Sequence, residues 1–233
     1  MVVAEACRNL ACVGAEPIAL TDCLNFGDPE KPEVYYQLEQ CIRGIAEASR
    51  KFDAPVISGN VSLYNESRGT GIYPTPVVGA LGLLQDVSRR ADIGFRDAGD
   101  VVVLIGRDSL DSAAEELAGS EYLEQVHGLV AGSPSIDLDL EIAVQRACRR
   151  LVAEGMLRSA HDCSDGGLLV ALAESCIAGG VGVVIDAALP DRWDAALFGE
   201  GQSRIVVSLS PPSLGALTDV CRQEGAPWGE LGA

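Results

Sequence analysis

The chain has 233 residues, of which 34 are acidic and 17 are basic, so its formal net charge is −17. This balance excludes a protein that grips a nucleic-acid backbone, because neutralising phosphates requires clustered Lys and Arg, and it disfavours docking to an anionic membrane. A small phosphorylated substrate remains compatible, since a few local groups and Mg²⁺ can offset a negative field. With 48% apolar residues, the chain suits one large or two modest domains with a buried core.

The 8 cysteines and 2 histidines show no CxxC motif and no zinc-ligand spacing. Most of the cysteines lie in apolar runs, which predicts reduced core residues. No secretory signal opens the chain, and no apolar run approaches the roughly 20 residues that cross a bilayer. We therefore predict a soluble protein of the cytoplasm.

The first third of the chain alternates helical and extended patterns. We predict the following elements in order: a helix from the first residues to Gly14, a strand Pro17–Leu24, a helix Glu33–Phe52, a strand Ala54–Tyr64 broken by Gly59, a loop Ser67–Pro76 and a strand Val77–Leu84. The chain starts and stops abruptly, which predicts a piece of a longer polypeptide. The alternative is a compact natural protein with frayed termini.

A polar, charged segment at residues 86–98 predicts a domain boundary. Beyond it we expect another alternating series: strand Val101–Ile105, helix Ile136–Glu154, strand Arg158–His161, helix Gly167–Ala178, strands Val181–Ile185 and Ile205–Leu209, and helix Ser213–Gln223. The fold class predicted is therefore α/β (α+β) in two units, with mixed rather than purely parallel sheets.

Polar residues lie in or beside two of the predicted strands. Asp22 lies where one strand runs toward Gly27, a position suited to meeting a nucleotide group or a metal, although it could equally stabilise only the turn. Gly59 interrupts an apolar strand, which indicates close approach of the backbone to a ligand, or a bulge. Asn60 offers an amide oxygen suited to Mg²⁺, and alternation places Ser62 on the same face. The alternative is an edge strand with a solvated face.

A second set of polar residues surrounds two glycine-containing turns. Asp162 and Asp165 precede Gly166 and Gly167, which open a helix whose N–H groups could approach an anion while the carboxylates hold Mg²⁺. The alternative is that Ser164 or Asp165 is merely the helix N-cap. His161 is interpreted as structural rather than catalytic. The segment 197–204, which contains Glu200 and Gln202, is either a ligand loop or a tight turn.

Five segments together resemble one enzyme family. They are Thr21–Gly27 (TDCLNFG), Ser58–Glu66 (SGNVSLYNE), Tyr73–Gly79 (YPTPVVG), Gly119–Leu123 (GSEYL) and His161–Leu168 (HDCSDGGL). The chain is similar, essentially end to end, to the second half of phosphoribosylformylglycinamidine synthase, synthetase subunit, of the small bacterial type. The last two segments occur across the wider aminoimidazole ribonucleotide synthetase-like superfamily, whereas the first two are more specific.

The resemblance implies a fold in which each half of a duplicated subunit holds an N-type and a C-type domain. Residues 1–88 would be a second N-type domain truncated at its N-terminus, and residues 97–233 a second C-type domain truncated at its C-terminus. The C-type domain would combine a mixed sheet with packed helices. The N-type domains of the two halves would pair their sheets into a barrel, with active sites in the clefts.

The resemblance also implies an activity, which is the ATP- and Mg²⁺-dependent conversion of formylglycinamide ribonucleotide, with glutamine-derived ammonia, to its amidine in purine biosynthesis. By that resemblance, Asp22 and Gly59 would bind ATP, Asn60 would bind Mg²⁺ and Ser62 would contact the substrate. No catalytic residue is expected in this chain, because the family's general acid/base histidine lies in the other half. The implied partners are that first half, a glutaminase subunit and a small adaptor subunit.

The resemblance is imperfect in the second set of polar residues. Asp162 and the Glu200–Gln202 loop would face a pseudo-symmetric nucleotide site, and Gly201 stands where the first-half pattern carries Ser, which weakens any substrate role. Two alternatives stay open: a non-catalytic nucleotide-binding half, or another superfamily enzyme such as aminoimidazole ribonucleotide synthetase. The latter would need a Gly/Asp-rich ATP loop near its N-terminus, which this chain lacks.

Overall fold

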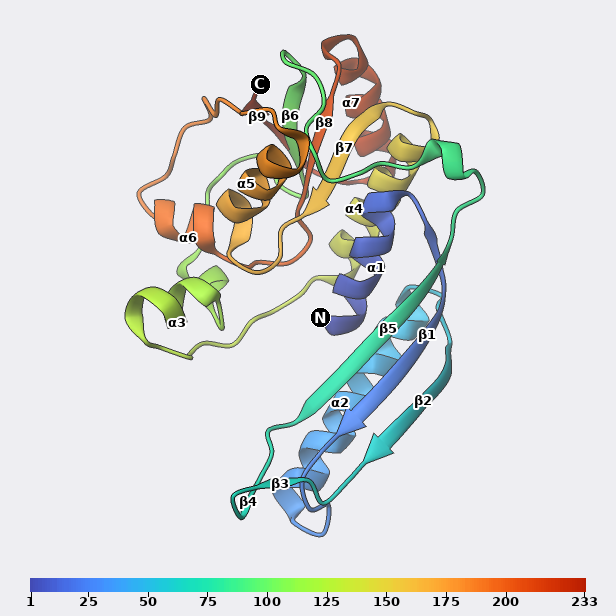
Figure 1. The fold of residues 1–233 in the computed structure, drawn as a ribbon, viewed down its shortest axis with the longest axis vertical. Coiled ribbons are helices and arrows are strands. Elements are labelled where there is room, and N and C mark those ends of the chain that lie inside the picture. Colours follow the sequence, from blue (N-terminus) through green and yellow to red (C-terminus); the bar gives the residue numbers. More distant parts are fainter. The chain divides into compact units, whose positions relative to one another are not determined.

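The computed structural model describes residues 1–233, which divide into two units (Figure 1). The first unit comprises residues 2–10 and 16–83, and the second comprises residue 1, residues 11–15 and residues 84–233. Each unit has its own sheet and its own apolar core. The mixed α/β class predicted from the alternating pattern is confirmed.

The first unit is built on a three-stranded sheet of order β2-β1-β5. Strand β1 pairs in parallel with β2 and antiparallel with β5, so this sheet is mixed. Its elements are β1 (Glu16–Asn25), α2 (Pro32–Lys51), β2 (Val56–Ser62), the short hairpin β3 (Glu66–Ser67) and β4 (Thr70–Gly71), and β5 (Thr75–Leu83). Helix α1 (Val2–Val13) contributes its residues 2–10 to the same unit.

Helix α2 covers one face of this sheet (Figure 1). The helix begins at Pro32, where the missing N–H of proline costs nothing because the first turn has no acceptor for it. Its apolar residues recur at helical spacing and pack on alternate residues of β1 and β5, among them Ile45, Ala48, Leu20, Leu24 and Val78. The core of the first unit therefore lies between this helix and one face of the sheet.

The opposite face of the three-stranded sheet exposes apolar side chains. Val77, Leu81 and Leu83 alternate with the core residues of β5 and are 54%, 49% and 48% exposed. The strand β2 forms one edge of the sheet and is exposed along most of its length. The residues at this open face and edge are thus available to a ligand or to another polypeptide surface.

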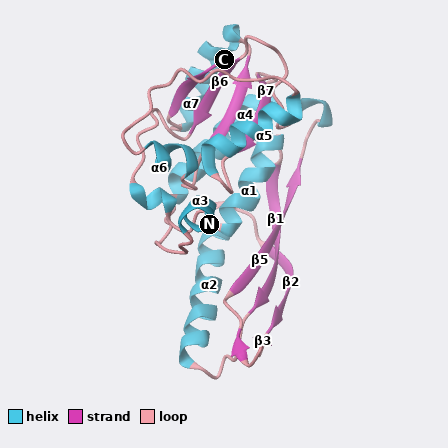
Figure 2. Cartoon of the chain, turned by 60° about the vertical axis from the view of Figure 1, so that its left-hand side comes forward, coloured by secondary structure: helices cyan, strands magenta, loops and turns pink.

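The second unit has a four-stranded sheet of order β7-β8-β6-β9 between two helical layers (Figure 2). Its strands are β6 (Val101–Ile105), β7 (Leu157–Asp162), β8 (Ile205–Leu209) and β9 (Trp228–Gly232). The pairings between these strands are antiparallel, and parallel pairing is limited to a single bridge between Asp92 and Ser159.

The helices of the second unit sort onto the two faces of its sheet by apolar spacing. Helices α4 (Leu138–Ala153) and α7 (Leu214–Glu224) pack on one face, and α5 (Gly167–Gly179) packs on the other with α6 (Trp193–Phe198). Because β6 and β8 are covered on both faces, every one of their residues is buried. Short α3 (Glu121–His127) and the single turns η1 (Val87–Arg89), η2 (Ala114–Leu117) and η3 (Pro211–Ser213) complete the unit.

Two predicted strands differ from the structure. Gly59 does not break its strand, because β2 runs through it from Val56 to Ser62. The segment 181–185 forms no strand and contributes only one bridge, from Ile185 to Gly232. The edge position beside β6 is taken instead by β9, at the end of the chain.

The cysteines agree with the prediction of reduced thiols, since all 8 are free and five of them are buried. Burial, with the neighbouring Cys148, raises the pKa of Cys221 to about 12, so this thiol carries no charge at neutral pH. None of the helices combines the length and apolar character needed to cross a membrane.

Candidate functional site

Asp22 and Gly59 lie directly opposite each other on the paired strands β1 and β2. A Cβ built on Gly59 would collide with the Asp22 carboxylate and would stand 2.7 Å from the Asp22 carbonyl oxygen. The glycine is therefore required by the aspartate: the side chain of Asp22 occupies the space above the Gly59 backbone. The signal that predicted a close backbone approach at Gly59 is explained within the protein by this contact.

Asn60 and Ser62 lie on the opposite face of β2 from the Asp22–Gly59 pair, since successive residues of a strand alternate between faces. Their partners on β1 are Cys23 and Asn25, which share that face. Asn60 is exposed, whereas Ser62 is half-buried and donates to the Asn65 side-chain oxygen at 3.1 Å. The four predicted site residues thus form two pairs on opposite faces of the sheet, three of them on the edge strand β2 and Asp22 on β1, and not a single cluster.

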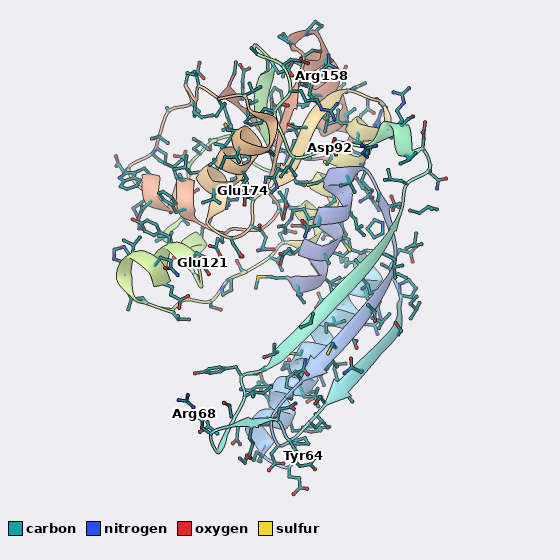
Figure 3. All side chains as sticks on the ribbon, in the orientation of Figure 1. Tyr64, Arg68, Asp92, Glu121, Arg158 and Glu174 are labelled. Carbon is teal, nitrogen blue, oxygen red and sulfur yellow. The ribbon has the colours of Figure 1, made fainter.

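Asn65 links the ends of β1 and β2, a role that the sequence did not reveal. Its side-chain nitrogen donates to the carbonyl oxygens of Phe26 at 3.1 Å and Ser62 at 2.8 Å, which ties the ends of β1 and β2 together. Tyr64 beside it has a left-handed backbone (φ 58) and donates its hydroxyl to Glu30 (Figure 3). A polar residue between two strand ends is a signal that could have identified this link from the sequence.

The donor set on β2 fits Mg²⁺ only in part. Asn60 supplies a neutral amide oxygen, the kind of hard ligand that Mg²⁺ accepts. However, the chain contains no group of three or more His, Cys, Asp or Glu side chains placed to hold a metal ion. Because Mg²⁺ is usually held by one or two protein oxygens together with substrate phosphates, Asn60 can serve as one ligand of a shared site.

The second predicted site is differently arranged from what the sequence suggested. Asp162 is buried and Asp165 is exposed, so the two carboxylates do not converge on one ion. The N-cap of α5 is Gly166 in the left-handed conformation (φ 78), and neither Ser164 nor Asp165 caps this helix with its side chain. The interpretation of Ser164 or Asp165 as the N-cap is therefore wrong, whereas a metal role for Asp162 and Asp165 stays a prediction.

His161 bridges the end of β7 to α5. Its Nε2 lies 2.9 Å from the Glu174 carboxylate, and its Nδ1 lies 3.5 Å from Asp162 (Figure 3). The hydrogen bond with Asp162, helped by Glu174 and opposed by burial, raises the pKa of His161 above its ordinary value. Both ring nitrogens thus face carboxylates of the protein, which supports the structural role predicted for this histidine.

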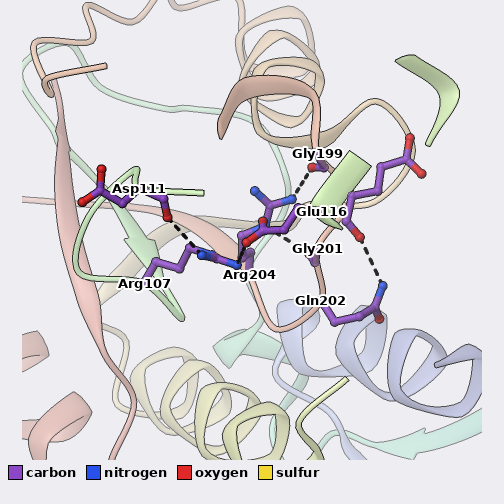
Figure 4. Close-up of polar contacts among 8 residues, drawn as sticks. Arg107, Asp111, Glu116, Gly199, Gly201, Gln202 and Arg204 are labelled. Carbon is purple, nitrogen blue, oxygen red and sulfur yellow. Dashed lines mark hydrogen bonds and ion pairs between the residues drawn. The ribbon is translucent and has the colours of Figure 1, made fainter. Parts of the chain in front are cut away.

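The loop 199–204 is held by Arg204 (Figure 4). This arginine is 1% exposed, and its guanidinium donates to the carbonyl oxygens of Gly199 and, at 3.0 Å, Gly201. Arg107 pairs with Glu116, which lies against Gly201 from the other side. Arg204 was not singled out from the sequence, although a basic residue three positions after Gly201 is close enough along the chain to reach the carbonyl oxygens of this loop.

Two family models match the chain. The model described as "AIR synthase related protein, N-terminal domain" matches residues 1–84, and the C-terminal domain model of the same name matches residues 97–233. The chain belongs to the AIR synthase related protein family. Within this family, the N-terminal domain corresponds to the first unit with Asp22 and Asn60, and the C-terminal domain corresponds to the greater part of the second unit.

The curated relatives of this family member are synthase subunits. The chain is 53% identical over 242 residues to "Phosphoribosylformylglycinamidine synthase subunit PurL" of Anaeromyxobacter dehalogenans, covering 99% of the chain and 31% of the relative. It is also 53% identical to the subunit of the same name in Thermomicrobium roseum, with the same coverage. The chain therefore spans about a third of the length of the curated relatives that it matches.

Solved structures share the fold of this AIR synthase related chain. Thermotoga maritima PurL, determined in complex with FGAR, superposes with a TM-score of 0.76 at 20% identity, over 98% of this chain and 37% of that one. Escherichia coli HypE, a hydrogenase maturation protein, gives a TM-score of 0.75 at 16% identity, over 99% and 72% of the two chains. At these identities the likeness establishes the fold alone.

Proposed function

We propose that the chain is the part of a phosphoribosylformylglycinamidine synthase, an ATP-dependent carbon–nitrogen ligase, that supplies nucleotide, metal and substrate contacts from β1 and β2. The observation that carries the proposal is the 53% identity with the Anaeromyxobacter subunit over 99% of this chain. The more distant HypE fold offers no comparable support for a maturation enzyme, because its identity is 16%.

The proposed reaction belongs to the whole synthase. ATP transfers its γ-phosphoryl group to the amide oxygen of formylglycinamide ribonucleotide, which releases ADP and gives an iminophosphate. Ammonia derived from glutamine then attacks the iminophosphate carbon, phosphate leaves, and formylglycinamidine ribonucleotide remains. Such a reaction serves de novo purine biosynthesis in the cytoplasm.

The residues of this chain would act by binding and orienting. Asn60 and Ser62 stand on the open face of the edge strand, where Asn60 would give one oxygen to Mg²⁺ and Ser62 would contact the substrate. Asp22, lying above Gly59 on the other face, would contact ATP together with the Gly59 backbone. A nucleotide lying along the exposed edge of β2 can reach both pairs, because the edge is common to the two faces. The metal, when bound, would neutralise charge on the phosphates.

The remaining groups of the reaction must come from partners. We propose that these are the other portion of the synthase subunit, a glutaminase subunit that delivers ammonia, and a small adaptor subunit. The length of the relatives supports the first of these, since this chain spans 31% of them. The Thermotoga protein has been determined in an assembly named PurLQS, which supports partner subunits, and in complexes with ATP and with FGAR, which support the two small ligands.

The test is a reconstitution. The chain is mixed or fused with the portion of a related subunit that it does not span, and ADP formation is followed with formylglycinamide ribonucleotide, Mg²⁺, ATP and ammonium. We expect ADP release that requires all four components. A folded assembly that binds ADP·Mg²⁺ but releases no ADP would contradict the ligase and favour a non-catalytic nucleotide-binding half.

A further inference from the structure

The carboxylate of Glu200 accepts hydrogen bonds from two backbone N–H groups of different elements. Its Oε1 lies 2.8 Å from the nitrogen of Gly166, the N-cap of α5, and 2.8 Å from the nitrogen of Glu121, the first residue of α3. N–H groups at the start of a helix have no partner within the helix and attract anions. The side chain of Glu200 therefore takes the place that an oxyanion from solvent or from a ligand would take.

The loop that carries Glu200 is fixed on several sides. The Glu200 N–H donates to the Glu116 carbonyl oxygen at 2.8 Å, and Phe198 stacks on Tyr122 of α3 with ring centroids 4.9 Å apart. Arg204 donates to the carbonyl oxygens on both sides of Glu200, those of Gly199 and Gly201 (Figure 4). The carboxylate cannot leave the two N–H groups unless its side chain rotates away or these contacts break.

The loop that carries Glu200 also covers Gly167, the residue after Gly166. A Cβ at Gly167 would stand 2.9 Å from the Phe198 carbonyl carbon and 3.0 Å from the Leu197 carbonyl oxygen, closer than real Cβ contacts allow. The close backbone approach that this glycine permits is thus made to the protein's own loop. The Cβ side of Gly167 is therefore filled by the 197–204 loop.

We infer that Glu200 is an internal anion that closes the start of α5 to external oxyanions, such as inorganic phosphate or a nucleotide phosphate. This inference concerns the second unit and stands apart from the proposed function, which rests on β1 and β2. The role of the Gly166–Gly167 segment is then to hold the 197–204 loop in place, while Glu200 of that loop also binds the start of α3.

The test compares three forms of the chain: wild type, E200A, and E115A, which removes a carboxylate from an exposed position of η2 and is the charge-matched control. Amide signals of Gly166 and Glu121 are followed by NMR during titration with inorganic phosphate against chloride at equal ionic strength. Hydrogen exchange at the same two amides is measured without phosphate.

In wild type and E115A we expect no phosphate-specific shift at Gly166 or Glu121. In E200A both amides should exchange about tenfold or more faster, because a hydrogen bond to a charged acceptor is lost, and both should shift with phosphate. Phosphate-specific shifts at Gly166 in wild type would overturn the inference, and so would unchanged exchange at both amides in E200A. If E200A does not fold, the wild-type titration remains decisive by itself.

Discussion

At the scale of single residues, the Asp22–Gly59 contact restricts which side chains can stand at position 59. The aspartate fills the space where a side chain at position 59 would lie, so the two positions cannot vary independently. Because β2 is an edge strand, a misfit at Gly59 is relieved by moving β2 away from β1. Such a movement would displace Asn60 and Ser62 as well.

We predict that G59A lowers the free energy of unfolding of the first unit by about 1–3 kcal/mol, because the methyl group must push the strand or the aspartate aside. The matched control is G44A, an exposed helix-interior glycine of α2 with nothing within 4 Å of its Cβ position. This control should stabilise the same unit by about 0.5–1 kcal/mol. Urea unfolding of both variants measures the difference, and equal stability of G59A and wild type would show that the contact is not tight.

His161 gives the second unit a stability that depends on pH. Its folded-state pKa is raised, mainly by Asp162, so the protonated form is favoured by folding. The resulting stabilisation is fully present below the unfolded pKa of about 6.5 and is lost as the pH rises through the folded pKa. We predict that wild type is more stable than H161Q in mildly acidic solution and that the difference shrinks as the pH rises through the raised folded-state pKa of His161.

Denaturation of wild type and H161Q at a series of pH values measures this effect. A stability difference that does not change with pH would mean that the contribution of His161 comes from packing alone. A difference that grows with rising pH would contradict the sign derived from the two neighbouring carboxylates.

At the scale of elements, the conformation of the loop 199–204 depends on the planar shape of the Arg204 guanidinium. One planar group reaches two carbonyl oxygens, and the side chain is almost fully buried. A lysine keeps the charge but cannot present two donors in a fixed fork. We predict that R204K lowers the free energy of unfolding of the second unit by about 1–3 kcal/mol, since a buried acceptor loses its partner.

The control for this prediction is R222K, an exposed arginine of α7 that pairs with Asp219 on the same helix. It should change stability by less than about 0.5 kcal/mol, as exposed ion pairs contribute little. Thermal or urea unfolding of the two variants makes the comparison. Equal effects of R204K and R222K would contradict the role given to the buried guanidinium.

Elements with a strong internal pattern could be predicted from the sequence, whereas those that depend on distant partners could not. The long helices α2 and α4 follow directly from apolar spacing, and β6 follows from its apolar run. The segment 181–185 has a similar apolar pattern but forms no strand, and it meets the outer edge of β9 only through the bridge from Ile185 to Gly232 and a few neighbouring backbone hydrogen bonds. How far two segments pair is settled by tertiary contacts, which local pattern does not encode.

In the candidate site, too, local pattern predicted some features, while others depended on residues far apart in the sequence. Alternation along β2 was enough to place Asn60 and Ser62 on one face, but the opposite orientation of Asp22 and Gly59 required the register between β1 and β2. Glu200 could not be paired with Gly166 from the sequence, since the two are 34 positions apart and meet only through the folded loop. Residues far apart in sequence are the ones whose roles needed the structure.

At the scale of the whole molecule, the two units differ in what they leave open to a ligand. The first unit offers an open sheet face with apolar residues and the polar pair Asn60 and Ser62. The second unit has its glycine-rich helix start filled by its own Glu200. The acidic composition, with a net charge of −17, disfavours a phosphorylated ligand unless local basic groups or a metal offset the negative field.

In the proposed ligase, β2 brings Mg²⁺ and substrate together, and Asn60 is the residue that would hold the metal. In the reconstituted synthase, ADP formation is measured against Mg²⁺ concentration for N60A and for S58A, whose serine shares the face and bonds to Thr21 at 2.8 Å. We predict that N60A requires about tenfold more Mg²⁺ for half-maximal rate, or loses activity, while S58A matches wild type. An unchanged Mg²⁺ requirement in an active N60A enzyme would contradict this role of Asn60.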